Sequence, residues 1–410
     1  MPGRARFRWA VAAALLGALG CPAPPAATPP APRQYLYLWT ASADTSAPDF
    51  LAVLDVTESP DRYGDLVATL AVPGRENRPH HTEHEMPADR QLFANGFATG
   101  QTFIFDLTSP TEPRLVRQFG DVAGYTHPHS FLRLPNGNVL ATFQMAHAAS
   151  GMRPGGLAEI TPAGEVRRSA AADQPGVDPG TRVYSGAVVP GLDRIVTTTT
   201  DMVADFPASN QLQIWRLSDL SLQHTIALPP GPRGDEGQLT AEPRVLADGK
   251  TVLVSTFNCG LYLLDNLDGA TPAGRLVASF PTKENTSCAI PVVAGSFYLV
   301  TVPAWNAVVS LDISDPAHPR EVSRAGLGAD DVPHWIALSP DQRRVVVTGY
   351  GAMSNRVVLL KFDSRTGALA VDSAFREPDA TAPGYLMTGK TWPHGGTGAG
   401  IPHGAVFGRP

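Results

Sequence analysis

A segment of roughly fifty residues recurs along the chain, and this repeat restricts the fold more than any other feature of the sequence. Clear copies are PHSFLRLPNGNVLATFQ from Pro128, AEPRVLADGKTVLVSTFNCGLYLLD from Ala241, and PHWIALSPDQRRVVVTGYG from Pro333. Apolar runs alternate with turns such as Asn136-Gly137 and Asp248-Gly249, which are strong hairpin signals. A period of this length with four short strands predicts the blade of a β-propeller rather than a sandwich or a helical solenoid.

Seven copies can be counted from the residue at which the first strand of each copy begins. These residues are His81, His129, Ser185, Glu242, Cys288, His334 and His403. The last copy, IPHGAVFGRP, has room for one strand, whereas YLYLWTA, FLAVLDVT and LVATLAV near the N-terminus lack a first strand of their own. We therefore predict an all-β, seven-bladed β-propeller over residues 34–410, closed by pairing of the N- and C-terminal strands, which leaves no open sheet edge. Residues 151–182 and 375–400 are expected to form loops over one face.

The N-terminus has the layout of an export signal. Residues 1–21, MPGRARFRWAVAAALLGALGC, combine a basic start with an apolar run too short to span a bilayer comfortably. Residues 22–33 form a Pro/Ala-rich linker that cannot pack and should act as an extended tether. The segment resembles a bacterial lipoprotein signal, so either Cys21 is lipidated or the chain is cleaved nearby. We expect an exported protein, periplasmic or anchored to the outer membrane as a lipoprotein, with no transmembrane helix in the mature chain.

Charge argues against a nucleic-acid partner. The formal net charge is -6, and the basic residues, which include only four lysines, are scattered singly. A nucleic-acid-binding protein would concentrate basic charge in a patch or stripe. The two remaining cysteines, Cys259 and Cys288, stand in apolar strand-like contexts and are expected to be unpaired core residues, with a disulfide as the alternative.

The histidines fall on the predicted propeller axis. The first strand of every blade lines the central channel, so residues at the starts of different copies converge. Four of the eleven histidines, His81, His129, His334 and His403, occupy such starts, each with a proline one or two residues earlier. Converging neutral imidazoles suit a transition metal such as copper, with zinc, iron and nickel as the alternatives. The alternative is that these histidines hydrogen-bond strand ends and ordered water in a polar channel.

The stretch PHHTEH extends this set. His80 and His81 can both be ligands only if the backbone is irregular there, because adjacent strand residues face opposite ways; Pro79 favours such an irregularity. The predicted metal ligands are His80, His81, His129, His334 and His403. The residues expected to orient these ligands are His84 and His127. The predicted proton-transferring carboxylates are Glu83 and Glu242.

An ordered set of segments also carries a family resemblance. SAPDFLAVLDVTESPDRYGDLVATLAVP, the pair His80-His81, TFIFDLTSPTEPRLVRQF, NQLQIWRLSDLSLQHTIAL and LDISDPAHPREVSRAGLG follow the order seen in the selenium-binding protein family, whose bacterial members include copper-dependent methanethiol oxidase. The resemblance implies a seven-bladed propeller with copper bound by histidines that match His80, His81, His129 and His403. His334 is placed by the repeat alone. The family's cysteine pair implicated in selenium binding is replaced by TEHEMPAD, so selenium binding by that route is not expected.

Three functions remain open at this point. The first is a copper-dependent oxidase of a small thiol, similar to methanethiol oxidase, with dioxygen as the electron acceptor. The second is a non-catalytic metal-binding or protein-interaction propeller at the cell surface. The third is a lactonase-like hydrolase, which would require a site rich in carboxylates.

Overall fold

The computed structural model describes residues 32–59, 61–148, 151–204, 206–284, 286–349, 355–377 and 380–409, together with residues 1 and 3. Within these ranges the regular structure is β-strand apart from two short 3-10 helices, Pro190–Leu192 and Pro303–Trp305. No helix in this part of the chain is long and apolar enough to cross a membrane. The predicted signal peptide and most of the linker, with Cys21, lie outside the described residues, so export and lipidation stay predictions.

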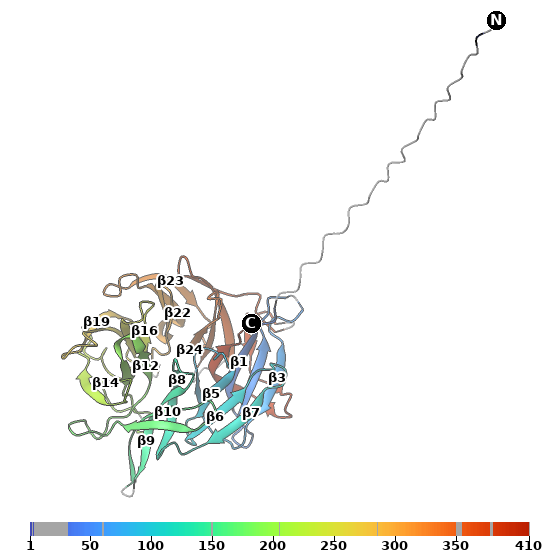
Figure 1. The fold of residues 1–410 in the computed structure, drawn as a ribbon. Helices are drawn as coiled ribbons and strands as arrows, with labels where there is room; N and C mark the ends of the chain where they lie inside the picture. The colour runs from blue at the N-terminus through green and yellow to red at the C-terminus, as the bar shows by residue number, and fades with distance from the viewer. Residues whose placement is uncertain are drawn as a thin grey trace. The chain divides into compact units, whose positions relative to one another are not determined.

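Residues 33–410 form one compact unit built from seven sheets arranged around a common centre (Figure 1). The first three sheets, written from inner to outer strand, are β4 (Pro79–Thr82), β5 (Gln91–Gly96), β6 (Gln101–Asp106) and β7 (Arg114–Phe119); β8 (Tyr125–Arg133), β9 (Val139–Ala148), β10 (Gly151–Ile160) and β11 (Val166–Ala171); and β12 (Gly186–Val189), β13 (Arg194–Thr198), β14 (Gln211–Arg216) and β15 (Leu222–Ala227).

The next three sheets follow the same plan. They are β16 (Thr240–Val245), β17 (Val252–Thr256), β18 (Gly260–Asp265) and β19 (Ala273–Ser279); β20 (Val292–Ala294), β21 (Phe297–Val302), β22 (Ala307–Asp312) and β23 (Arg320–Gly326); and β24 (Pro333–Leu338), β25 (Arg344–Gly349), β26 (Arg356–Asp363) and β27 (Ala368–Val371), with β28 (Tyr385–Leu386) also paired to β26. A two-stranded hairpin, β29 (Lys390–Thr391) and β30 (Thr397–Gly398), precedes the last strand.

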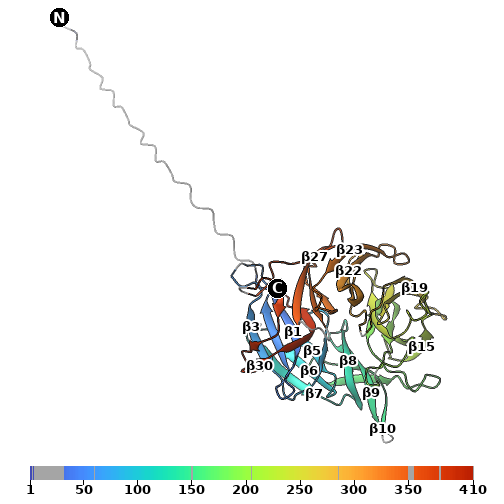
Figure 2. The same cartoon turned by 180° about the vertical axis from the view of Figure 1, so that it is seen from behind.

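The seventh sheet closes the ring with both ends of the chain. Its inner strand is the C-terminal β31 (Gly400–Phe407), followed by β1 (Tyr35–Ser42), β2 (Phe50–Asp55) and β3 (Leu66–Ala71). Strands β1 and β31 are antiparallel, with Leu36 opposite Phe407 and Leu38 opposite Ala405. The C-terminus accordingly lies beside β1 in both views (Figures 1 and 2). The predicted all-β, seven-bladed propeller with terminal closure is confirmed.

The hydrophobic core is divided among the spaces between neighbouring sheets. One cluster, for example, packs Trp39 and Val53 of the seventh sheet against Phe103 and Phe105 of the first. Middle strands such as β2 are buried along their length, whereas outer strands such as β7 and β23 are partly or mostly exposed and carry arginines. Charged outer edges discourage pairing with other chains. Packing between sheets therefore holds the inner strands in place around the channel.

The prediction of loops over residues 151–182 is wrong for half of that segment. Strands β10 and β11 occupy it and complete the second sheet. The glycines that suggested a loop are needed for close packing: a Cβ on Gly155 would lie 2.2 Å from the Phe143 carbonyl oxygen, and one on Gly156 would lie 2.0 Å from that of Ala170. Glycine in a strand can mark such a close approach of neighbouring backbones.

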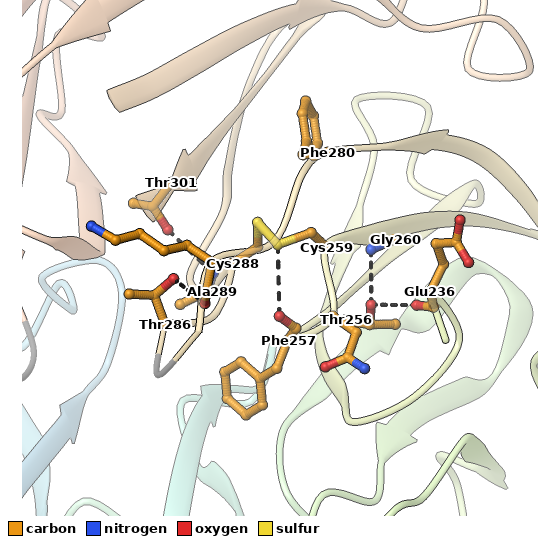
Figure 3. The surroundings of a disulfide bond; sticks show 12 residues. Glu236, Thr256, Phe257, Cys259, Gly260, Phe280, Thr286, Cys288, Ala289 and Thr301 are labelled. Carbon is orange, nitrogen blue, oxygen red and sulfur yellow. Dashed lines mark hydrogen bonds between the residues drawn. A yellow bond between two sulfur atoms is a disulfide. The ribbon is translucent and has the colours of Figure 1, made fainter. Parts of the chain in front are cut away.

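Cys259 and Cys288 form a disulfide, contrary to the expectation of unpaired cysteines (Figure 3). Cys259 lies in the turn between β17 and β18, and Cys288 lies in the segment that leads to β20, so the bond joins the fourth and fifth sheets. Both side chains are buried in the apolar cluster between these sheets, beside Phe280. The apolar surroundings were predicted correctly, but they do not distinguish a buried thiol from a buried disulfide.

Candidate metal centre

Each inner strand that carries a Pro-His pair contains one extra residue relative to its neighbour. In β4, Pro79 and Thr82 are opposite Gly96 and Ala94, so three steps along β4 match two along β5. Equivalent shifts occur between Pro128 and Phe131 in β8, between Pro333 and Trp335 in β24, and opposite Leu38 and Thr40 in β31. Such β-bulges bend a strand and re-aim its side chains. The irregular backbone predicted at Pro79 is therefore present.

The bulges leave backbone groups that the ladder cannot pair, and a buried side chain satisfies several of them. Asn95 on β5 accepts a hydrogen bond from the His81 N–H at 2.7 Å and donates to the carbonyls of Pro128 and His129 at 2.8 and 3.2 Å. The carbonyl of His403 accepts from the Thr348 hydroxyl at 2.6 Å. Asn95 thus couples the bulges of the first two sheets and fixes His81 relative to His129.

The result is a buried triad of imidazoles. His80, His81 and His129 are between 0 and 2% exposed, and each offers a ring nitrogen within 4.8 Å of those of the other two. The Nε2 atoms of His80 and His129 are 3.1 Å apart. Two imidazoles on one first-row metal ion, each about 2.0 Å from it, would place their nitrogens about 3.3 Å apart. The triad therefore fits a metal of the class predicted, through donors that suit copper or zinc and not calcium or magnesium.

The other two predicted ligands adjoin the triad. The His403 ring centroid is 4.1 Å from that of His80, and the His334 ring is 4.9 Å from that of His403. Gly404 makes this approach possible, because a Cβ there would lie 2.9 Å from the His80 carbonyl oxygen. Five imidazoles from four sheets thus form one continuous cluster. Which of them hold a metal stays a prediction.

Burial keeps these rings neutral. It lowers the pKa of His80, His81, His129 and His403 well below the ordinary value, and each neighbouring imidazole lowers it further. For His334 burial lowers the pKa to about 4. A neutral imidazole retains the lone pair that a metal requires, so at neutral pH the cluster is ready to bind a cation without first losing protons.

The two predicted carboxylates differ in their surroundings. Glu83 is held by Arg133, whose Nε and Nη2 donate to its two oxygens at 2.9 Å each, and by the Phe93 N–H at 3.0 Å. Burial nevertheless raises the pKa of Glu83 to about 7. Both of its oxygens are engaged by these donors, and no imidazole is among its hydrogen-bond partners in the described part of the chain.

Glu242 is fully buried and connected to the triad through two serines. Its Oε2 accepts hydrogen bonds from Ser185 Oγ at 2.8 Å and from Arg244 Nη1 at 2.7 Å. Ser185 is 3.1 Å from Ser130 Oγ, which lies 3.0 and 3.3 Å from the Nδ1 atoms of His129 and His81. Burial raises the pKa of Glu242, and the cation of Arg244 opposes that rise. Sequence reasoning missed Ser130 and Arg244, although each lies within two residues of a predicted site residue.

His84 and His127 lie at the edge of the cluster. The His84 ring stacks on Trp335 with centroids 4.6 Å apart, and its Nε2 lies 3.1 Å from Arg244 Nη2. Because a guanidinium can only donate, this nitrogen must accept, and its lone pair is not available to a metal. His127 has a positive φ of 57° and contacts Phe97 edge-on, so it does not share a face with His129 as a regular strand would require.

A cavity of about 380 Å³ adjoins the cluster at His334. Apart from that histidine, it is lined largely by apolar side chains, including Phe206, Leu239, Phe257, Pro303 and Val332. Leu239 and Val332 precede inner strands, whereas Phe206, Phe257 and Pro303 lie between second and third strands, so the cavity lies at the end of the channel where the inner strands begin. A small and largely apolar molecule would fit this opening.

Comparison with known proteins extends these observations. No family model matches the chain. The chain is 27% identical to methanethiol oxidase from Hyphomicrobium sp over 340 residues, which cover 77% of this chain and 75% of that protein. The resemblance to the selenium-binding protein and methanethiol oxidase family is confirmed.

Solved structures share the fold. A hypothetical selenium-binding protein from Sulfolobus tokodaii superposes with a TM-score of 0.73 at 17% identity, covering 92% of this chain and 94% of that one. The periplasmic gluconolactonase PpgL of Pseudomonas aeruginosa gives 0.63 at 13% identity, covering 92% and 99%. At these identities the likeness concerns the propeller alone, and any functional inference must come from the site.

Proposed function

We propose that this chain is a metal-dependent oxidase of a small thiol, similar to methanethiol oxidase, with copper held by His80, His81 and His129. The observation that carries the proposal is a buried triad of neutral imidazoles in a chain that resembles a methanethiol oxidase over 340 residues. Imidazole donors suit copper among the available transition metals. His403 and His334, which adjoin the triad, are proposed as further ligands or as neighbours of the bound substrate.

The proposed reaction converts a thiol, dioxygen and water into an aldehyde, sulfide and hydrogen peroxide. When bound, copper would supply redox chemistry and a place for the thiol sulfur. The residues of the chain supply the remaining conditions. The apolar cavity at His334 favours a small apolar thiol over a charged one, and the buried rings around the triad exclude bulk water. Glu242 is the proposed carboxylate for proton movement, because its hydrogen-bonded chain reaches the triad whereas Glu83 is engaged by Arg133.

The other functions receive less support. A lactonase-like hydrolase would need carboxylates around the metal, and the donor atoms gathered here are imidazole nitrogens. A non-catalytic metal-binding propeller uses the same cluster and differs only in consuming no oxygen. We also propose that the protein is exported, which agrees with a disulfide between Cys259 and Cys288, since such bonds persist in oxidising compartments.

The test is metal analysis followed by oxygen uptake with methanethiol. Protein purified from the periplasmic fraction should contain about one copper per chain, because the triad is proposed to hold a single ion. It should also consume oxygen while releasing sulfide and peroxide. His81→Ala/His129→Ala should lose both properties. His318→Ala is the matched control, because this histidine is exposed between β22 and β23 and paired with Asp315, outside the cluster. Copper without oxygen uptake would indicate the binding propeller, and a folded wild type that takes up no metal would reject the proposal.

A further inference from the structure

A chain of hydrogen bonds crosses four of the seven sheets and ends on two imidazoles of the triad. It starts at Glu242 on β16, passes through Ser185 just before β12 and Ser130 on β8, and reaches His129 on β8 and His81 on β4. All five side chains are no more than 2% exposed. Because bulk water does not reach them, the donors and acceptors along this chain are set by the protein itself.

The direction of each bond follows from the chemistry at the Glu242 end. Arg244 can only donate, and the Glu242 oxygen that receives it also lies 2.8 Å from Ser185 Oγ, so this carboxylate oxygen accepts from both. Ser185 has one hydroxyl proton and gives it to Glu242. It must therefore accept from Ser130, which gives up its own single proton in turn.

The Ser130 oxygen then has only lone pairs left for its two remaining neighbours. These are the Nδ1 atoms of His129 and His81, at 3.0 and 3.3 Å. Both ring nitrogens must donate, so both imidazoles carry their proton on Nδ1.

The opposite nitrogens are thereby left as lone pairs. His129 Nε2 lies 3.1 Å from His80 Nε2 and, as a lone pair, accepts the proton that His80 carries there in the metal-free protein. His81 Nε2 is buried and has no hydrogen-bond partner in the described part of the chain. A metal between the three rings could bind these two Nε2 atoms only if His81 and His129 keep their protons on Nδ1.

We propose that Glu242, acting through Ser185 and Ser130, is a positioning residue that fixes His81 and His129 as Nδ1–H tautomers and so presents both Nε2 lone pairs to a metal. The assignment rests on the proposed function only in naming a metal, because the tautomers belong to the metal-free protein. Partners of this kind typically change metal affinity about 10- to 100-fold when removed.

The test is nitrogen-15 NMR of histidine-labelled, metal-free protein, in which long-range proton–nitrogen couplings distinguish the two neutral tautomers. In the wild type, His81 and His129 should be Nδ1–H. Ser185→Ala should leave the pair of Glu242 with Arg244 intact but release the Ser130 hydroxyl, so that the two rings become a mixture of tautomers. Ser185→Thr, which keeps a hydroxyl, should restore the single form.

A zinc titration against a competing chelator provides the second readout. Zinc affinity should fall about 10- to 100-fold in Ser185→Ala. It should stay unchanged in Ser310→Ala, a fully buried serine on β22. An Nε2–H tautomer at either ring of the wild type would overturn the proposal. So would unchanged tautomers in Ser185→Ala, or an equal loss of affinity in Ser310→Ala. Failure of thiol oxidation alone would reject the proposed function and leave these tautomers as they are.

Discussion

The disulfide between the fourth and fifth sheets should make a measurable contribution to stability. Cys259 and Cys288 are separated by 29 residues in sequence. Cross-linking a loop of that length lowers the entropy of the unfolded chain by about 12 cal/mol/K, which corresponds to about 3.6 kcal/mol at 25 °C. For a unit spanning residues 33–410, this corresponds to a decrease in Tm of roughly 4 to 5 °C on reduction. Reduction should leave the fold intact, because both cysteines are buried among apolar side chains that keep their packing.

The assay is urea unfolding of oxidised and reduced wild type, followed by tryptophan fluorescence. Cys259→Ala/Cys288→Ala should unfold like the reduced protein, apart from the loss of two sulfur atoms from the core. Thiol titration of the unfolded chain should give two more reactive groups after reduction than before. Equal stabilities of the oxidised and reduced forms would refute the assumption that the bond constrains the unfolded chain. Two reactive thiols without reductant would refute the bond itself.

Three further predictions concern the channel. The pKa of His334 is about 4 in the folded chain and about 6.5 when unfolded, so the stability that it contributes is complete above pH 6.5 and is lost as the pH falls towards 4. Metal-free wild type should therefore lose about 2 kcal/mol more than His334→Gln between pH 7.5 and pH 5 in urea unfolding, and parallel curves would contradict this. Gly404→Ala places a Cβ 2.9 Å from the His80 carbonyl oxygen, so it should lower the free energy of unfolding by about 1 to 3 kcal/mol and weaken metal binding. An unchanged Tm would mean that β31 and β4 separate freely. Asn95→Leu removes the partner of three buried backbone groups and should lower the free energy of unfolding in urea by at least about 2 kcal/mol. A smaller loss would show that other groups or water replace the amide.

The sequence was sufficient for the propeller because the repeat encodes it directly. Turns such as Asn136-Gly137 mark hairpins, and the incomplete copies at the two ends imply closure through β31. The Pro-His pairs also predicted where the channel lies. A proline at the start of an inner strand disturbs the ladder there, and the bulge that follows lets the adjacent residues His80 and His81 join the same cluster.

Other features depend on contacts that no local pattern records. The glycines of β10 resemble a loop in sequence, and only the neighbouring backbones of β9 and β11 explain them. The partner of Cys259 lies on the next sheet, so its distance is set by how blades pack and not by spacing along the chain. Ser185 starts its copy of the repeat and Ser130 follows His129, but neither position by itself signals a role. Their role follows only when the ring brings them between Glu242 and the imidazoles.

Strand β31 links closure of the ring to assembly of the candidate metal centre. It completes the seventh sheet through β1 and carries His403 into contact with His80. A molecule in which β31 has not docked therefore has neither a closed ring nor the complete set of imidazoles. Metal uptake at the full cluster requires a closed ring, so a loaded site would report that a molecule has finished folding.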